Sequence, residues 1–393
     1  MKDKRSLKDN FIRADEVFEQ NLQHMLAAYR GRGGEKRVRP LRLVLVSVLS
    51  TLLVSAMALA LAGKTGALDF LFSPQRDLAF TYVTSYREGV RGWVITGYYG
   101  LEEAVVIPDK INRIQVSGIG AGAFARSEKL TGITLPRSLE AIGDSAFFGC
   151  DNLASVTFEG GTLSGGSRLK TIGKSAFADC KGLSAFTIPD SVSCIDDTAF
   201  TGCSGLTDIA LPGGLSYLGE GVFSDCASLT GVSIPEGIDK LRGGLFAGCL
   251  SLESVDIPDS VGSIGTAVFS DCSSLNSIAL PRGITNIPDY AFWRCESLTA
   301  IRIPEGVTNI GEFAFYWCDA LESITLPEGT ASIGQEAFAW CTALTSAALP
   351  DSVKAIGEEA FNYCDNVKLQ VGNGSYAQQY AQERQIPFEI VHE

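Results

Sequence analysis

Proline and phenylalanine recur every 23 residues along most of this chain, and this periodicity constrains its fold more than any other feature. Prolines stand at positions 189, 212, 235, 258, 281, 304, 327 and 350, and phenylalanines at 200, 223, 246, 269, 292, 315, 338 and 361. Phe124, Phe147 and Phe177 extend the phenylalanine series backwards, with one longer interval around a glycine-rich insert near residues 160–166. A period of this size is typical of stacked repeats, each too small to bury its own apolar side chains.

One unit, residues 298–318, shows how each repeat is expected to fold. Ile301 and Ile303 alternate with polar neighbours, which predicts a short strand with one buried face. Ala314 and Cys318 are four residues apart, the spacing of one face of a helical turn. We therefore predict an α/β repeat, in which about eleven 23-residue rungs stack as a solenoid around one continuous core.

The unit L-x-x-I-x-I-P-x-x-V-x-x-I-G-x-x-A-F-x-x-C resembles the BspA-like leucine-rich repeat family of bacterial surface proteins, over residues 106–365. Residues 93–98 resemble the family's N-terminal capping strand, and residues 374–388 resemble its C-terminal cap. The chain departs from commoner leucine-rich repeats because it has no asparagine ladder. The resemblance implies a leucine-rich repeat solenoid, extracellular recognition or adhesion, and no enzymatic activity.

An uncharged stretch of 21 residues, 43–63, precedes the repeats. As a helix it spans about 30 Å, the thickness of a bilayer core, so we predict one transmembrane helix. Six Lys and Arg residues lie shortly before it, which predicts a cytoplasmic N-terminus and an extracellular repeat domain. A cleaved signal peptide is the alternative, but its apolar region is shorter, about 7–15 residues.

These features divide the chain into five parts. Residues 1–42 form a cytoplasmic segment with 11 Lys and Arg against 6 Asp and Glu, either an amphipathic helix or a weakly structured basic tail. The transmembrane helix spans 43–63, a linker and N-terminal cap 64–105, the solenoid 106–366 and a C-terminal cap 367–393. After residue 42 the chain has 21 Lys and Arg against 39 Asp and Glu, which argues against nucleic acid as a partner.

Ten of the eleven cysteines occupy one position of the repeat. Neighbouring rungs are close enough for disulfides, but parallel side chains do not bring their Cβ atoms to the required distance of about 3.8 Å. We therefore expect free, buried thiols, with Cys194 outside this column and near the surface. The sequence has no C-x-x-C motif that would indicate a zinc site. Acidic residues recur along the rungs, but this pattern fits a solvated face better than calcium sites, so we expect no metal and no cofactor.

The two histidines, His24 and His392, lie near the ends of the chain. The repeats therefore hold no Ser-His-Asp triad and no Cys-His pair, and we expect no enzyme. The sequence instead indicates a membrane-anchored extracellular protein that binds a macromolecular ligand, a protein or a glycan, in adhesion or cell-surface recognition. The alternatives are a membrane-tethered signalling protein with a sensing ectodomain, and an envelope carbohydrate binder.

The two positions after each repeat phenylalanine suggest where the ligand binds. They are small or polar through the middle rungs but become aromatic in the last four. Because the phenylalanine and the cysteine that flank them face the core, these side chains should point outward and form a strip about 15–20 Å long. Exposed aromatic residues supply much of the energy of binding interfaces. The candidate ligand-binding residues are Trp293, Tyr316, Trp317, Trp340 and Tyr363; the alternative is that they only shield one another or the C-terminal cap.

Overall fold

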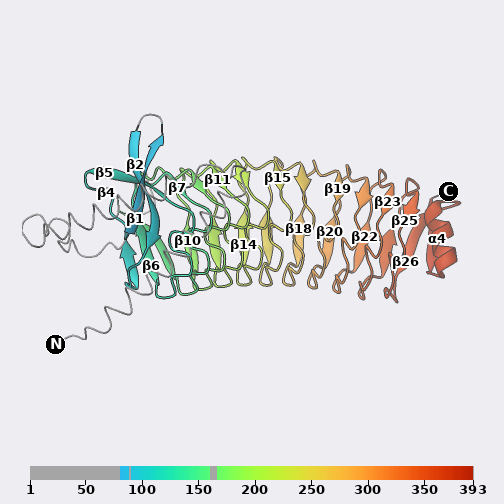
Figure 1. Cartoon of the computed structure of the whole chain (residues 1–393). Coiled ribbons are helices and arrows are strands. Elements are labelled where there is room, and N and C mark those ends of the chain that lie inside the picture. The colour runs from blue at the N-terminus through green and yellow to red at the C-terminus, as the bar shows by residue number, and fades with distance from the viewer. Residues whose placement is uncertain (1–79, 88–89, 160–165, 393) are drawn as a thin grey trace, which may run out of the picture. The chain divides into compact units, whose positions relative to one another are not determined.

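The computed structural model describes residues 80–87, 90–159 and 166–392, which belong to one compact unit, Leu78–Glu393. Within this unit the chain winds as a stack of coils, from the first strands to a C-terminal helix (Figure 1). The segments predicted for 1–42, 43–63 and the first part of 64–105 lie outside the described residues. Within the described ranges, no helix is long and apolar enough to cross a bilayer.

The first row of strands uses the alternating apolar residues that follow each repeat leucine. The paired strands of this row are parallel, and in the regular coils the partners are one full repeat apart in the sequence, as in the pair Ser277 and Ala300. The row consists of β3 (Ala104–Val106), β6 (Gly132–Leu135), β8 (Ser155–Phe158), β10 (Ala185–Thr187), β12 (Asp208–Ala210), β14 (Gly231–Ser233), β16 (Ser254–Asp256), β18 (Ser277–Ala279), β20 (Ala300–Arg302), β22 (Ser323–Thr325), β24 (Ser346–Ala348), β26 (Lys368–Gly372) and β27 (Phe388–His392).

A second row, in which the strands from β7 (Ala141–Ile142) onward are only two residues long, runs along another side of the coils (Figure 1). It begins at an antiparallel hairpin, β1 (Phe80–Arg87) and β2 (Val90–Tyr98), whose second strand pairs in parallel with β5. The row continues through β4 (Lys110–Ile111), β5 (Ile114–Ile119), β7 (Ala141–Ile142), β9 (Thr171–Ile172), β11 (Cys194–Ile195), β13 (Tyr217–Leu218), β15 (Lys240–Leu241), β17 (Ser263–Ile264), β19 (Asn286–Ile287), β21 (Asn309–Ile310), β23 (Ser332–Ile333) and β25 (Ala355–Ile356).

The predicted helical turn in each rung is wrong. The segment around each repeat phenylalanine is a chain of turns in which two residues four apart adopt left-handed backbone, such as Phe313 at φ 56° and Trp317 at φ 60°. Alternate backbone N–H groups then point at the next coil, where Phe315 N donates to Ala337 O at 2.8 Å and Trp317 N to Ala339 O at 2.9 Å. Among the described residues, the single α-helix is α4 (Tyr376–Arg384), so the repeat is a β-solenoid and not an α/β repeat.

The core is a set of columns that run through all the coils. Rings of the repeat phenylalanines from Phe124 to Phe361 stack on one another with centroids 5.0–5.9 Å apart. Eleven coils carry such a phenylalanine, and the capping strands bring the solenoid to about 13 turns, two more than the predicted eleven. The core is therefore shared between neighbouring coils, as the repeat predicts.

The cysteine column has a specific hydrogen-bonding role. Each of its ten thiols donates to the carbonyl oxygen of the repeat phenylalanine in the preceding coil, with S···O distances of 3.0–3.2 Å. Burial raises the pKa of Cys203 and of Cys249 to about 12, which keeps the donating proton on the sulfur. All eleven cysteines are free, and Cys194 is half-buried outside the column.

Helix α4 packs against β25 and β26 at the C-terminal end of the stack. Its N-cap residue, Ser375, accepts a hydrogen bond from Gln378 N at 3.1 Å, and its C-cap, Gln385, is left-handed. Ala377, Tyr380 and Ala381 are its buried residues. The helix therefore covers apolar side chains that a further coil would otherwise cover.

Candidate ligand-binding site

The structure brings the five predicted residues into one aromatic strip, defined as Trp293, Tyr316, Trp317, Trp340 and Tyr363. Trp340 stacks between Trp317, at a centroid distance of 5.6 Å, and Tyr363, at 4.0 Å. Tyr316 joins the two parts of the strip, 6.5 Å from Trp293 and 6.2 Å from Trp317. Trp317 and Tyr363 are 37% and 51% exposed, and the other three are half-buried. The strip thus lies at the surface, and its rings support one another.

Two further aromatic residues, Tyr290 and Phe313, belong to the same surface and were not predicted. Their rings are parallel with centroids 5.1 Å apart, and Phe313 meets Tyr316 edge-on at 5.7 Å. They occupy the position two residues before the repeat phenylalanine, which is small or polar in the earlier coils from Ser145 to Gly244. At this position too, small or polar residues in the earlier coils give way to aromatic residues in later ones. This change is visible in the sequence and could have predicted Tyr290 and Phe313.

Five of these seven aromatic residues have left-handed backbone. Their φ angles are 56–64° at Tyr290, Phe313, Trp317, Trp340 and Tyr363. A side chain with a Cβ atom costs roughly 1–2 kcal/mol in this conformation, and bulky residues rarely adopt it. Some other coils have glycine at the equivalent positions, as at Gly202, Gly221, Gly244 and Gly248, and most of the rest have small or polar residues such as Asp179 and Thr198. Large aromatic side chains are unusual in this conformation, so their presence here needs another explanation.

A charged group lies in the middle of the strip. The Arg294 guanidinium is 5.4 Å from the ring centroids of both Trp293 and Trp317, close enough for cation–π attraction. It also forms ion pairs with Asp271 at 3.5 Å and Glu296 at 3.3 Å. The arginine therefore connects the two lines of rings and is neutralised by its acidic neighbours.

Asp319 lies next to this group and accepts a hydrogen bond from Trp317 Nε1 at 3.1 Å. Burial raises the pKa of both Asp271 and Asp319. Within the described part of the chain, Arg294 Nε and Asp319 Oδ1 are buried side-chain atoms without a hydrogen-bond partner. Unsatisfied buried polar atoms are costly and rare in a folded protein, so each of them requires an explanation.

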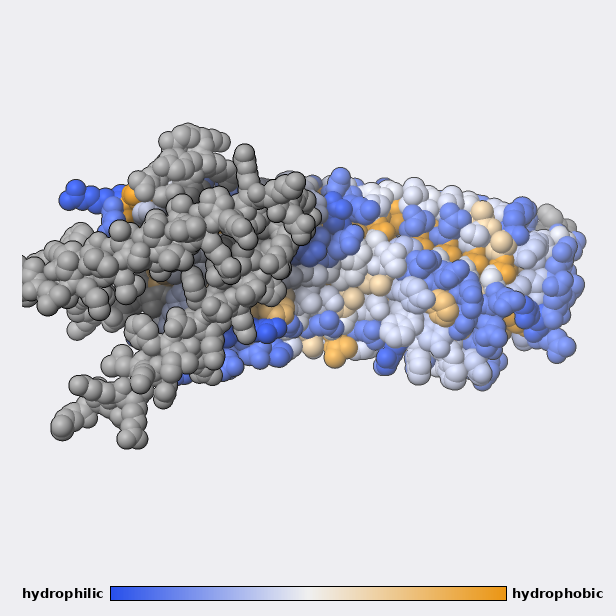
Figure 2. Space-filling model, viewed as in Figure 1, coloured by the Kyte–Doolittle hydropathy of each residue, from blue (hydrophilic) through white to orange (hydrophobic). Residues whose placement is uncertain are grey.

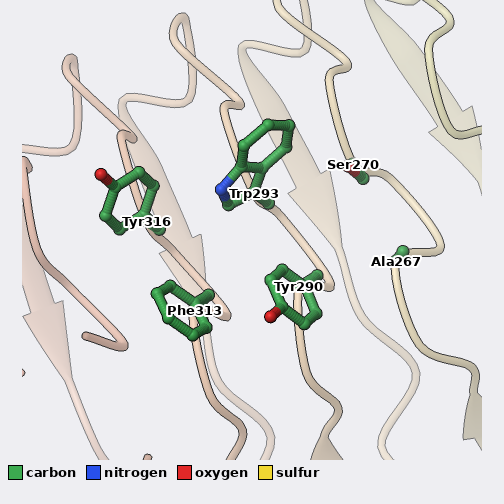
Figure 3. A pocket seen from close by; sticks show the side chains of 6 residues that line it. All are labelled: Ala267, Ser270, Tyr290, Trp293, Phe313 and Tyr316. Atoms are coloured by element: carbon green, nitrogen blue, oxygen red, sulfur yellow. The ribbon is translucent and has the colours of Figure 1, made fainter. Parts of the chain in front are cut away.

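The aromatic strip together with Tyr290 and Phe313 forms what we call the aromatic surface. A hollow of about 420 Å³ lies at its N-terminal end. We call it the notch. In Figure 3, Tyr290 and Trp293 lie between Phe313 and Tyr316 of the next coil and the small residues of the preceding coil. The notch is lined by Ala267, Ser270, Tyr290, Trp293, Phe313 and Tyr316. It exists because the small residues of one coil are followed by large rings at the same positions of the next.

A second hollow, of about 460 Å³, lies on the first row between β12 and β14. It is lined by small, aliphatic and acidic side chains, without an aromatic ring. On the face seen in Figure 2, hydrophobic residues of the later coils form narrow rows between hydrophilic ones. Among the later coils that this view leaves uncovered, these rows do not merge into one broad apolar patch.

Comparison with known proteins agrees with this architecture. The family model for the BspA type leucine-rich repeat region matches six copies, over residues 103–166, 117–250 and 240–368. A leucine-rich cell surface protein from Faecalibacterium prausnitzii A2-165 is 28% identical and has a TM-score of 0.51, covering 78% of this chain and 96% of that one. The pneumococcal vaccine antigen PcpA has the same fold, with 17% identity, a TM-score of 0.53, and coverage of 80% and 97%.

A leucine-rich repeat protein of T. pallidum is 34% identical over 50% of this chain and 88% of that one, with a TM-score of 0.46. A search of curated proteins finds no match. The family match extends over residues 103–368, which include most of the described coils. The chain belongs to the BspA-type leucine-rich repeat family.

Proposed function

We propose that this protein is a non-enzymatic recognition protein of the cell surface, and that its aromatic strip holds a macromolecular ligand. The family membership supports a location at the cell surface, because the relative from Faecalibacterium prausnitzii is described as a cell surface protein. Adhesion, or recognition of a neighbouring cell, is the role that best fits an exposed solenoid with one concentrated aromatic surface.

The observation that carries this proposal is the left-handed backbone under the strip. Trp317, Trp340 and Tyr363 occupy a position where Gly202 and Gly248 stand in other coils. Aromatic residues there cost backbone energy, roughly 1–2 kcal/mol each, and mutual ring stacking returns about 0.5–1.5 kcal/mol. The strip thus contributes little to folding, whereas tryptophan and tyrosine are enriched among residues that dominate binding energy.

The strip is tested with the double variant Trp317→Gly, Trp340→Gly, which keeps a residue suited to the backbone. The full chain, in detergent, is applied to an array of extracellular-matrix proteins and glycans. We expect binding to whichever ligand the unaltered protein selects to weaken roughly 30-fold or more. The melting temperature should change by only a few degrees, because the core columns remain intact.

The matched control is Tyr99→Ala, which removes a 59% exposed ring from the other end of the solenoid and should leave binding unchanged. If the double variant binds as well as the unaltered protein, the strip is not the ligand site. If it melts far below the unaltered protein, the rings belong to the core.

We also propose that residues 43–63 anchor the chain in the membrane with the solenoid outside. The uncharged length and the preceding basic cluster support this orientation. Protease added to intact cells should cleave between the anchor and the solenoid, so that a C-terminal tag is lost from the cells while residues 1–42 stay protected. Retention of the tag until the cells are lysed would contradict this topology.

A further inference from the structure

Most ring faces of the aromatic surface are already covered by other rings. Tyr290 lies parallel to Phe313 within 7°, and Trp293 lies parallel to Tyr316 within 14°. A planar or disc-shaped ligand can stack only on a face that no neighbour covers. In the preceding coil the equivalent positions hold the small residues Ala267 and Ser270, so no large ring precedes Tyr290 or Trp293 there. The uncovered faces of these two rings therefore look into the notch (Figure 3).

The two uncovered faces meet at a steep angle. Phe313 and Tyr316, to which Tyr290 and Trp293 are nearly parallel, are inclined at 65° to each other. The notch is thus a corner with two aromatic walls, and Ala267 and Ser270 leave its third side open. Its volume of about 420 Å³ is at the lower end of the range for small-molecule sites, roughly 300–1,000 Å³. One ring of a larger ligand fits such a space.

The six residues that line the notch carry polar groups but no charge. The charged side chains nearest to it, Asp271 and Arg294, form an ion pair with each other at 3.5 Å. Four groups can form hydrogen bonds there: the hydroxyls of Tyr290, Tyr316 and Ser270 and the indole N–H of Trp293. Within the described residues, the first two hydroxyls and the indole have no protein partner, and Ser270 Oγ makes only a long contact of 3.5 Å with Asp271.

This combination matches the chemistry of a saccharide ring. A pyranose presents a face of C–H groups, which packs on an aromatic ring, and a rim of hydroxyls, which need donors and acceptors. Uncharged walls give no reason to favour an anionic or cationic ligand, and a purely apolar ring such as a phenyl group would leave the four polar groups of the rim without ligand partners. We propose that the notch binds one ring of a neutral saccharide, stacked on Trp293 and Tyr290; this inference rests on the proposed recognition function and names the ligand class.

The test uses the full chain, purified in a detergent without a sugar head group, on an array of neutral, acidic and cationic oligosaccharides. The affinity of the neutral oligosaccharide with the strongest signal is then measured by titration for the unaltered protein and for two variants of the notch. Ala267→Tyr fills the notch, and it should fold because Tyr290 and Phe313 occupy the same position in the next two coils with the same backbone. Trp293→Ala removes one wall. Thr198→Tyr, at the equivalent position three coils earlier, is the matched control.

We expect both notch variants to bind the neutral oligosaccharide roughly tenfold or more weakly, and Thr198→Tyr to bind as the unaltered protein does. The saccharide inference is overturned if the unaltered protein binds no neutral member, if it prefers charged members, or if both notch variants keep full affinity. A matrix protein or peptide whose binding is blocked by Ala267→Tyr, without any saccharide binding, would also overturn it. In these cases the strip proposal is judged separately, by the Trp317 and Trp340 variant.

Discussion

Replacing Phe269 with alanine is expected to lower the free energy of unfolding by about 3–5 kcal/mol. The ring is fully buried, with Phe246 stacked on one side at 5.7 Å and Phe292 on the other at 5.5 Å. Its loss leaves a cavity between three coils that the rigid coil-to-coil hydrogen bonds prevent from closing. Urea denaturation followed by circular dichroism measures the change.

The same replacement should also divide the unfolding transition. Each coil of a solenoid contacts only its neighbours, so stability is close to a sum of coil and interface terms. A weakened interface at the middle separates the coils before it from those after it, and we expect two unfolding steps where the unaltered protein has one. Trp317→Gly is the control at the surface, with a change of about 1 kcal/mol or less, because relief of backbone strain offsets lost stacking. Equal losses in the two variants would contradict the division between core and strip.

Replacing Gly334 with alanine is expected to cost about 1–3 kcal/mol, the cost typical of overpacking. A Cβ atom at this position would lie 2.5 Å from Glu312 N and 2.5 Å from Gly311 C in the preceding coil. These are backbone atoms, which cannot rotate away as a side chain can. Gly334 N also donates to Ile310 O at 2.8 Å, so the two coils cannot separate without losing hydrogen bonds.

Gly262 provides a matched control for this effect, because a Cβ atom there would have no neighbour within 4 Å. Gly262→Ala should therefore change the melting temperature little, while Gly334→Ala lowers it by several degrees. If the two variants melt together, close approach of the coils is not what requires glycine at residue 334.

The period of the repeat was sufficient to predict the solenoid and its core. The regular spacing of phenylalanine, cysteine and the strand residues shows which side chains share a column, and the structure confirms each of these columns. The predicted helical turn failed because Ala314 and Cys318 have the same spacing on a helix and on two successive turns. The two alternatives differ in the sign of φ, which is positive at the turns. Residues such as Phe313 and Trp317 give no sign of a positive φ in the sequence, whereas the glycines of earlier coils, such as Gly221 and Gly202, do.

The aromatic strip could be predicted because it is a change of residue type at fixed positions of the repeat. The notch could not be predicted in the same way, since it depends on the step between two successive coils. Ala267 is unremarkable in its own coil and matters only because Tyr290 follows it at the same position. The orientations of Tyr290 and Trp293, which turn one face of each ring toward the notch, also depend on packing, which residue spacing does not specify.

The exact register between coils has a consequence for the length of such proteins. Partners in neighbouring coils are one full repeat apart in the sequence, so insertion or deletion of one whole repeat recreates the same contacts at the new junction. The longer interval between Phe147 and Phe177 shows that a shorter addition does not disturb the phenylalanine column, because these two rings still stack at 5.0 Å. Duplication of a gene segment that encodes one repeat therefore lengthens the molecule by one step without remodelling either end. The reach of the protein is set by the number of copies.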